Sequence, residues 1–90
     1  MLEIKPTNRF NRDLKLAARR GYNFSILREV VDKLARQEAL PEKNRDHALF
    51  GDYEGCRECH LAPDWLLIYK VSSNELILYL MRTGTHSDLF

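Results

Sequence analysis

Residues 56–65, CRECHLAPDW, contain a C-x-x-C-H run, which is the attachment signature of c-type haem and half of a common zinc pattern. Haem attachment needs both cysteines and the histidine at one porphyrin edge. On a strand, Cys56 and Cys59 would lie about 10 Å apart and point to opposite faces. A disulfide is excluded for the same reason, because bridged Cα atoms lie within about 7 Å. The pattern therefore argues against both haem and a disulfide.

Zinc would need four ligands, and one set of clustered candidates exists: His47, Cys56, Cys59 and His60. No second C-x-x-C or H-x-x-x-H pattern completes a zinc finger. We therefore expect no metal site, although a small metal-binding protein remains an alternative. Cys59 is most simply a small core residue, and the sequence assigns no role to Cys56.

The three histidines all follow residue 46 and stand at expected strand ends or turns. Each lies within a few residues of an acid, in the pairs Asp46 and His47, Asp64 and His60, and Asp88 and His86. Imidazole can take up or release a proton near neutral pH, and loops on a rigid sheet are common places for sites. The spacing is compatible with a shared acid–base site, and the alternative is that the histidines are ordinary surface or core residues.

Two helices and a series of strands must position these residues. Apolar residues recur at helical spacing from Phe10 to Ala18 after a Thr7 cap, and again from Leu27 to Ala35 after Asn23 or Ser25, before Pro41. Strands are predicted at residues 2–5, 47–50, 57–62, 65–71 and 75–81. The pattern predicts an α+β fold in which a short N-terminal strand and an antiparallel helical hairpin precede an antiparallel meander of about four strands.

Length and charge limit the function further. Ninety residues form one domain, residues 1–90. Residues 1–36 hold nine Lys/Arg against four Asp/Glu, a net charge of +5, and residues 37–90 carry −4. Such asymmetry indicates that the N-terminal part meets a polyanion. The longest apolar run, residues 76–81, is too short to span a membrane, which needs about 20 residues, and no signal peptide is seen, so we expect a cytoplasmic protein.

Two stretches, RDHALFGDYEGCRECHLAPDWLLIYKV and MRTGTHSDLF, resemble the YafQ branch of the RelE/ParE toxin superfamily. The family pattern is roughly D-H-x-L-x-G, then G-x-R-[DE]-x-H-[LVI]-x-x-D-W-[LVI]-L-[IV]-Y, then R-T-G-[TS]-H-x-x-L-F. All three blocks occur in order, and the resemblance covers essentially the whole chain. The departures are Cys56, Cys59 and Ala48, so C-x-x-C-H is interpreted as two variable strand positions that became cysteine.

The resemblance implies an mRNA interferase, an endoribonuclease toxin that cuts mRNA in the ribosomal A site. In this chemistry the ribose 2′-OH attacks the adjacent phosphate and no metal or cofactor is needed. It implies a catalytic set of His47, His60, Asp64, His86 and Arg82. His86 is the expected general acid, and Asp64 or His60 takes the 2′-OH proton or orients the group that does. Arg82 is expected to brace the phosphate, and Trp65 and Phe90 to stack on or wedge a base.

The same resemblance implies a cognate antitoxin, with a toxin that is monomeric alone and forms a hetero-oligomer with that antitoxin. We further expect contacts to ribosomal RNA phosphates from four basic residues of the first helix, Arg12, Lys15, Arg19 and Arg20. The alternative class is a non-catalytic protein with the RelE/ParE fold that binds RNA or a protein partner. The histidine set argues against that alternative.

Overall fold

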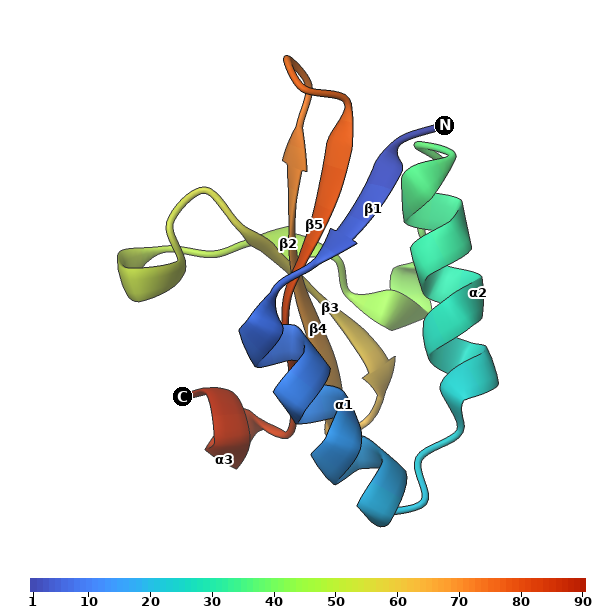
Figure 1. The fold of residues 1–90 in the computed structure, drawn as a ribbon, viewed down its shortest axis with the longest axis vertical. Coiled ribbons are helices and arrows are strands. Elements are labelled where there is room, and N and C mark those ends of the chain that lie inside the picture. Colours follow the sequence, from blue (N-terminus) through green and yellow to red (C-terminus); the bar gives the residue numbers. More distant parts are fainter.

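The computed structural model describes residues 1–90 and contains one five-stranded sheet (Figure 1). The strand order is β1-β5-β4-β3-β2, with β1 parallel to β5 and every other neighbouring pair antiparallel. The strands are β1 (Glu3–Pro6), β2 (His47–Ala48), β3 (Arg57–Ala62), β4 (Trp65–Ser72) and β5 (Ile77–Gly84). The expected α+β fold is confirmed: β2 to β5 form the antiparallel meander, and the N-terminal strand adds a fifth strand at its edge.

Two helices of 12 residues each, α1 (Asn8–Arg19) and α2 (Phe24–Ala35), run in opposite directions beside the sheet (Figure 1). Each helix begins at a side-chain cap: Thr7 accepts from the backbone N–H of Phe10, and Asn23 accepts from that of Ser25. These caps and the helical hairpin follow the sequence pattern. None of the helices has the length and apolar character needed to cross a membrane.

The main core fills the space between these helices and one face of the sheet. It combines helix residues such as Phe10 and Leu34 with strand residues such as Cys59, Leu67 and Leu78. A smaller apolar cluster lies on the opposite face: Cys56, Leu66, Ile68 and Leu89. Because residues alternate along a strand, β3 sends Cys59 and Leu61 into the main core and presents Glu58 and His60 on the other face. That second face carries the site.

Several boundaries differ from the sequence-based expectation. Helix α2 ends at Ala35, not near Pro41, because Gln37 adopts a left-handed backbone with φ 60°. Strand β5 covers residues 77–84, two to three residues later than expected, and Leu76 with φ 58° completes the preceding turn. Two short 3-10 helices, η1 (Glu42–Asn44) and η2 (Gly51–Tyr53), flank β2, and a final turn of helix, α3 (His86–Leu89), ends the chain.

Candidate active site

His86 is the first residue of α3, and its position is set by a capping box. Thr85 accepts a hydrogen bond from the backbone N–H of Asp88, and the Asp88 carboxylate accepts one from the backbone N–H of Thr85. A Cβ at Gly84 would lie 2.9 Å from a carboxylate oxygen of Asp88, so glycine leaves room for this close turn. The pattern Thr85-x-x-Asp88 is a capping-box signal in the sequence. It marks a helix that is too short to show apolar periodicity and was not among the expected elements.

Asp64, in the turn between β3 and β4, orients the His86 ring. One carboxylate oxygen accepts from the ring Nδ1 of His86 at 2.8 Å and from its backbone N–H at 3.0 Å. These two bonds hold the pKa of the Asp64 carboxyl below its usual range, with the backbone bond contributing most. Because a carboxylate only accepts, Nδ1 carries a proton and Nε2 is left for chemistry. The pair therefore has the arrangement of an oriented acid–base histidine.

Glu58 and His60 project from the same face of β3, two residues apart. The Glu58 side chain is 6% exposed, and its Oε1 lies 4.0 Å from Nε2 of His60 and 3.4 Å from Nε2 of His47. Its Oε2 has no hydrogen-bond partner. Sequence reasoning did not select Glu58 as a site residue, although the strand alternation had placed it on the face of His60. The structure therefore adds a buried carboxylate to the histidine cluster.

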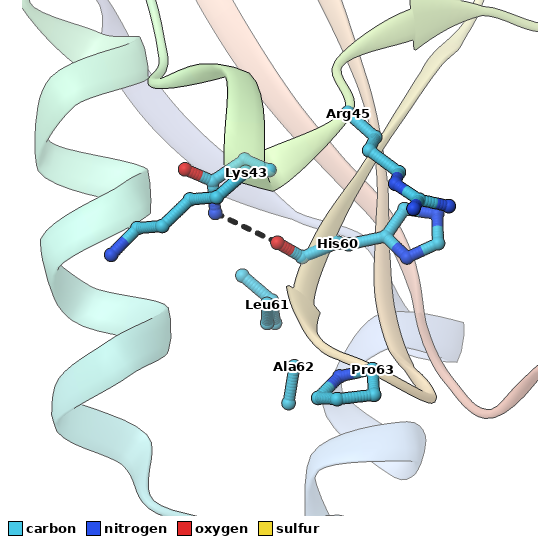
Figure 2. A pocket seen from close by; sticks show the side chains of 7 residues that line it. Lys43, Arg45, His60, Leu61, Ala62 and Pro63 are labelled. Atoms are coloured by element: carbon cyan, nitrogen blue, oxygen red, sulfur yellow. Dashed lines mark hydrogen bonds between the residues drawn. The ribbon is translucent and has the colours of Figure 1, made fainter.

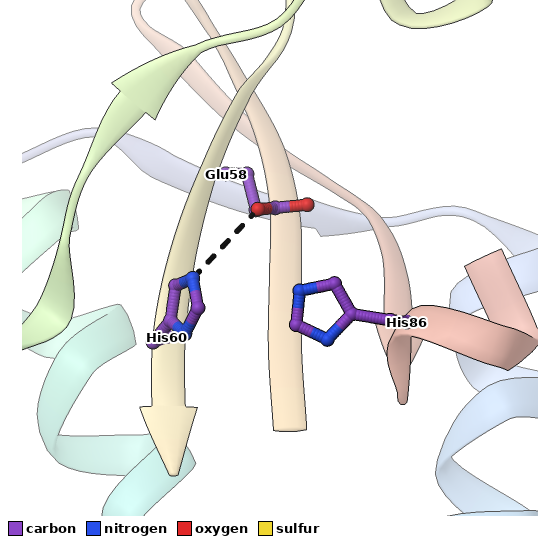
Figure 3. Close-up of side chains that lie close together, drawn as sticks. All are labelled: Glu58, His60 and His86. Atoms are coloured by element: carbon purple, nitrogen blue, oxygen red, sulfur yellow. Dashed lines mark ion pairs between the residues drawn. The ribbon is translucent and has the colours of Figure 1, made fainter. Parts of the chain in front are cut away.

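The His60 and His86 rings meet at this carboxylate, although they come from β3 and α3 (Figure 3). Their centroids are 5.7 Å apart and the ring planes are inclined by 60°. Glu58, His60 and His86 each present one ligand-type atom, and these atoms lie within 4.8 Å of one another. Two imidazoles and a carboxylate at this separation can move protons between neighbouring oxygens, and the same donors suit a transition metal.

His47 lies at the edge of this cluster, on β2. Its side chain is half exposed, and its Nδ1 donates to the backbone carbonyl of Arg45 at 2.7 Å. The pairing of β2 with β3 sets His47 opposite Glu58. The structure thus brings together four of the expected site residues, His47, His60, Asp64 and His86, and their catalytic roles stay predictions.

Arg82 has a different environment from the one expected. Its Nε and Nη2 donate to the Asp13 carboxylate of α1 at 2.8 and 3.1 Å, and both side chains are largely buried. The same carboxylate accepts the backbone N–H of Thr83 at 3.1 Å. Through this ion pair Arg82 joins α1 with β5, and its role at the phosphate stays a prediction.

Trp65 also lies elsewhere than expected. Its side chain is 3% exposed, and its ring packs against Tyr22 and Phe24 with centroids 4.9 and 6.3 Å away. It reaches the surface through a hollow of about 290 Å³ that it lines together with Asp64. The buried ring offers no free face to a base, so the expected stacking by Trp65 is not supported. Phe90 is 65% exposed and touches Tyr53 edge to face, so it remains available for stacking.

The four basic residues expected to bind rRNA lie in α1 or, for Arg20, at its C-cap, and they separate into two groups. Arg12, Lys15 and Arg19 are exposed and have no ion pair. Arg20 instead donates to both carboxylate oxygens of Asp88, at 2.6 and 3.2 Å, and so fixes α3 to α1. Arg20 therefore has a partner within the chain, and its rRNA contact stays a prediction, as do those of the other three residues.

The cysteines do not form the zinc set that the sequence left open. Cys59 belongs to the main core and Cys56 to the smaller cluster on the opposite face. Both are free thiols, and burial raises the pKa of the Cys59 thiol to about 12. Because Cys59 and His60 point to opposite faces of β3, the four side chains His47, Cys56, Cys59 and His60 cannot hold one ion.

Comparisons with known proteins agree with this geometry. A sequence model described as the bacterial toxin of type II toxin–antitoxin systems, YafQ, matches residues 2–90. The mRNA interferase toxin YafQ of Escherichia coli strain K12 is 36% identical over 89 residues, 98% of this chain and 95% of that protein. A metal-bound toxin from Helicobacter pylori is 42% identical, with a TM-score of 0.94 and all of both chains covered. A chain of the E. coli DinJ–YafQ complex is 35% identical, with a TM-score of 0.89 over 100% of this chain and 99% of that one. The chain therefore belongs to the YafQ family of bacterial toxins from type II toxin–antitoxin systems.

Proposed function

We propose that this protein is an endoribonuclease that cuts mRNA in the ribosomal A site by acid–base catalysis without a metal. The observation that carries the proposal is the His60–His86 pair, whose ring centroids lie 5.7 Å apart, with Asp64 bound to the His86 ring and Glu58 beside the His60 ring. The YafQ relative from E. coli is named as an mRNA interferase. A protein that only binds RNA or a protein partner does not require two histidines that are oriented by carboxylates.

The reaction needs one proton removed and one supplied. His60 takes the proton of the ribose 2′-OH, whose oxygen then bonds to the adjacent phosphorus. His86, held by Asp64, gives its Nε2 proton to the 5′-oxygen as the P–O5′ bond breaks. The products are a 2′,3′-cyclic phosphate and a 5′-hydroxyl end. The Glu58 carboxylate, 4.0 Å from Nε2 of His60, stabilises the positive charge that His60 gains.

The acid assignment has a direct chemical test. A substrate whose scissile 5′-oxygen is replaced by sulfur has a leaving group that needs no protonation. We expect His86→Ala to lose about 10²–10⁴-fold in rate on the natural substrate and to recover most of it on the sulfur substrate. His60→Ala should stay slow on both substrates. Equal loss for the His86 variant on both substrates would show that His86 is not the acid.

Ribosome dependence rests on the exposed basic face of α1. The side chains of Arg12, Lys15 and Arg19 have no acidic partner within the chain, which suits them to rRNA phosphates. Reversing these three charges to Glu should weaken ribosome binding and make that binding less sensitive to salt. The control is Arg28→Glu on α2, another exposed arginine without an ion pair. Unchanged ribosome binding in the triple variant would refute the assignment.

The test of the whole proposal is mRNA cleavage in a purified translation system, read by primer extension. Wild-type protein should cut within translated codons only when ribosomes are present, and His86→Ala should not cut. Absence of cuts with folded wild-type protein would refute the proposed activity. By analogy with the DinJ–YafQ complex, we also propose that a cognate antitoxin binds this chain and forms a hetero-oligomer with it.

A metal ion is a second candidate ligand, because the similar H. pylori toxin is described as metal-bound. Glu58, His60 and His86 fit such an ion by donor type, and their donor atoms lie within 4.8 Å of one another. A bound metal would occupy the nitrogen lone pairs that proton transfer uses. We therefore propose that a transition metal at these donors inhibits cleavage.

A further inference from the structure

The largest cavity of the site lies beside His60 and has a volume of about 480 Å³. Its wall combines the end of β3 and the following turn with the segment that contains η1: Lys43, Asn44, Arg45, His60, Leu61, Ala62 and Pro63 (Figure 2). Two of these residues are cationic and none is acidic. The cavity is therefore suited to an anionic group.

Arg45 is the free guanidinium of this wall. Three other arginines near the site are already paired, Arg20 with Asp88, Arg57 with Asp46 and Arg82 with Asp13. The Arg45 side chain has no ion pair or hydrogen bond within the chain and extends toward the His60 ring, whereas Lys43 points toward α2 (Figure 2). A planar guanidinium is well matched to phosphate oxygens.

Hydrogen bonds fix the backbone on both sides of Arg45, one to β3 through Asn44 and one to His47 of β2. The Asn44 side chain is 94% buried and donates through Nδ2 to the carbonyl of His60 at 2.7 Å. The Arg45 carbonyl accepts from Nδ1 of His47 at 2.7 Å, and Arg45 itself ends η1 with a left-handed φ of 49°. The guanidinium is thus carried by a segment whose position relative to His60 is set before any ligand arrives.

The position of the cavity indicates which phosphate it accepts. The scissile phosphate must lie between His60 and His86, and His86 does not line the cavity. The cavity therefore lies on the side of His60 that points away from His86. If His60 takes the 2′-OH proton, that side holds the nucleotide that carries the attacking 2′-OH.

We propose that Arg45 binds the RNA phosphate on the 5′ side of the nucleotide whose 2′-OH attacks. The proposal rests on the function proposed above and adds a binding group for a neighbouring phosphate, as distinct from the scissile one. Binding of this phosphate holds the attacking nucleotide in register with His60.

The test combines a protein variant with a modified RNA on programmed ribosomes. Arg45→Gln should lower kcat/KM about tenfold or more, mainly through KM, because a charged hydrogen bond is lost. A methylphosphonate at the named phosphate removes its charge and should slow the wild type by a similar factor. Arg45→Gln should not respond to that substitution, and Arg45→Lys should recover part of the loss. Arg28→Gln, on α2, is the matched control and should behave as wild type.

The outcomes separate the two proposals. No cleavage of the unmodified RNA by wild-type protein would refute the proposed function itself. Cleavage by the wild type with Arg45→Gln equally active would refute the role of Arg45 alone. Independent, multiplicative effects of the variant and the methylphosphonate would show that Arg45 contacts a different group. Thermal unfolding of Arg45→Gln should match the wild type, because this side chain has no partner within the chain.

Discussion

The pair formed by Asp13 and Arg82 offers the sharpest test of how the fold holds the site. It joins α1 to β5 just before the turn that leads to His86, across 69 residues of sequence. Asp13 accepts three hydrogen bonds, two from the guanidinium and one from the backbone N–H of Thr83. The variants Asp13→Asn and Arg82→Met, together with the double variant, form a double-mutant cycle. This cycle gives the interaction energy between the two charged side chains.

The magnitude follows from the geometry. Opposite unit charges 2.8 Å apart attract by about 6 kcal/mol at an effective dielectric constant of about 20, and desolvation of both groups offsets part of this. Removing one partner of a buried pair costs about 3–5 kcal/mol. The side chains keep exposed fractions of 13% and 15%, so we expect about 2–3 kcal/mol for either single variant and a coupling of about 2 kcal/mol.

The assay is denaturant and thermal unfolding of the four proteins under the same conditions. For a domain of this size each kcal/mol shifts Tm by about 4–8 °C, so either single variant should unfold about 10–20 °C below the wild type. The double variant should be more stable than the sum of the single effects predicts. A coupling energy below about 0.5 kcal/mol would refute the reasoning that this pair fastens α1 to β5.

Cleavage by the same proteins tells a structural Arg82 from a catalytic one. If Arg82 acts through the fold, the double variant should cut mRNA within about tenfold of the wild-type rate at a temperature where it is folded. If the double variant folds but cuts mRNA more than a hundredfold more slowly than the wild type, Arg82 has the phosphate-binding role that the family resemblance implies.

Further predictions concern the site and its anchors. Glu58→Gln should slow cleavage about 10–100-fold without lowering the unfolding midpoint, because a buried carboxylate oxygen without a partner contributes little to stability; a loss of stability with full activity would contradict this role. Zn²⁺ or Cu²⁺ should inhibit cleavage, and a chelator that spares Mg²⁺ should not; inactivation by that chelator would exclude the metal-independent mechanism. The hydrogen bond from Arg20 holds the pKa of Asp88 well below its usual range, so this carboxylate stabilises the fold above about pH 4 and the contribution is lost as the pH falls through the lowered value. Asp88→Asn should therefore be less stable than wild type at pH 7 and closer to it near pH 2 in thermal unfolding, and a pH-independent difference would argue against the assignment. Phe90→Ala should raise KM about tenfold, as expected for loss of one stacked base, and Phe90→Trp should restore it; equal KM values in all three proteins would remove Phe90 from the RNA site.

The sequence predicts the parts of this fold that depend on local periodicity. Helices α1 and α2, their caps at Thr7 and Asn23, and strand β3 with its alternating faces all follow from the spacing of apolar residues and from cap chemistry. The placement of His60 on the face opposite Cys59 was predictable for the same reason. These features depend on neighbours a few residues apart, which a single sequence displays directly.

Contacts between distant segments were not predictable in this way. The partner of Arg82, Asp13, lies 69 residues away in the sequence. The stacking role of Trp65 came from the family resemblance, which does not show that Tyr22 and Phe24 of the helical half cover this ring. A side chain's freedom depends on what packs against it, and periodicity carries no information about that. The family pattern identifies the positions His60, Asp64 and His86, but only the structure shows that Glu58 lies among the histidines.

The two faces of α1 therefore differ in function, and charge-reversal experiments on this helix must treat them separately. Asp13 and Arg20 are seven residues apart, about two helical turns, and both bind the C-terminal segment that carries His86. Arg12, Lys15 and Arg19 form a different, exposed face with no partner in the chain. Reversing the charge of Arg20 would place two negative charges together at Asp88, and we expect the resulting shift of α3 to slow cleavage through the position of His86. An activity assay alone would report this as a loss of ribosome binding. A charge-reversal experiment identifies an RNA-binding surface on this helix only if Arg20 is kept, and only if binding is measured apart from cleavage.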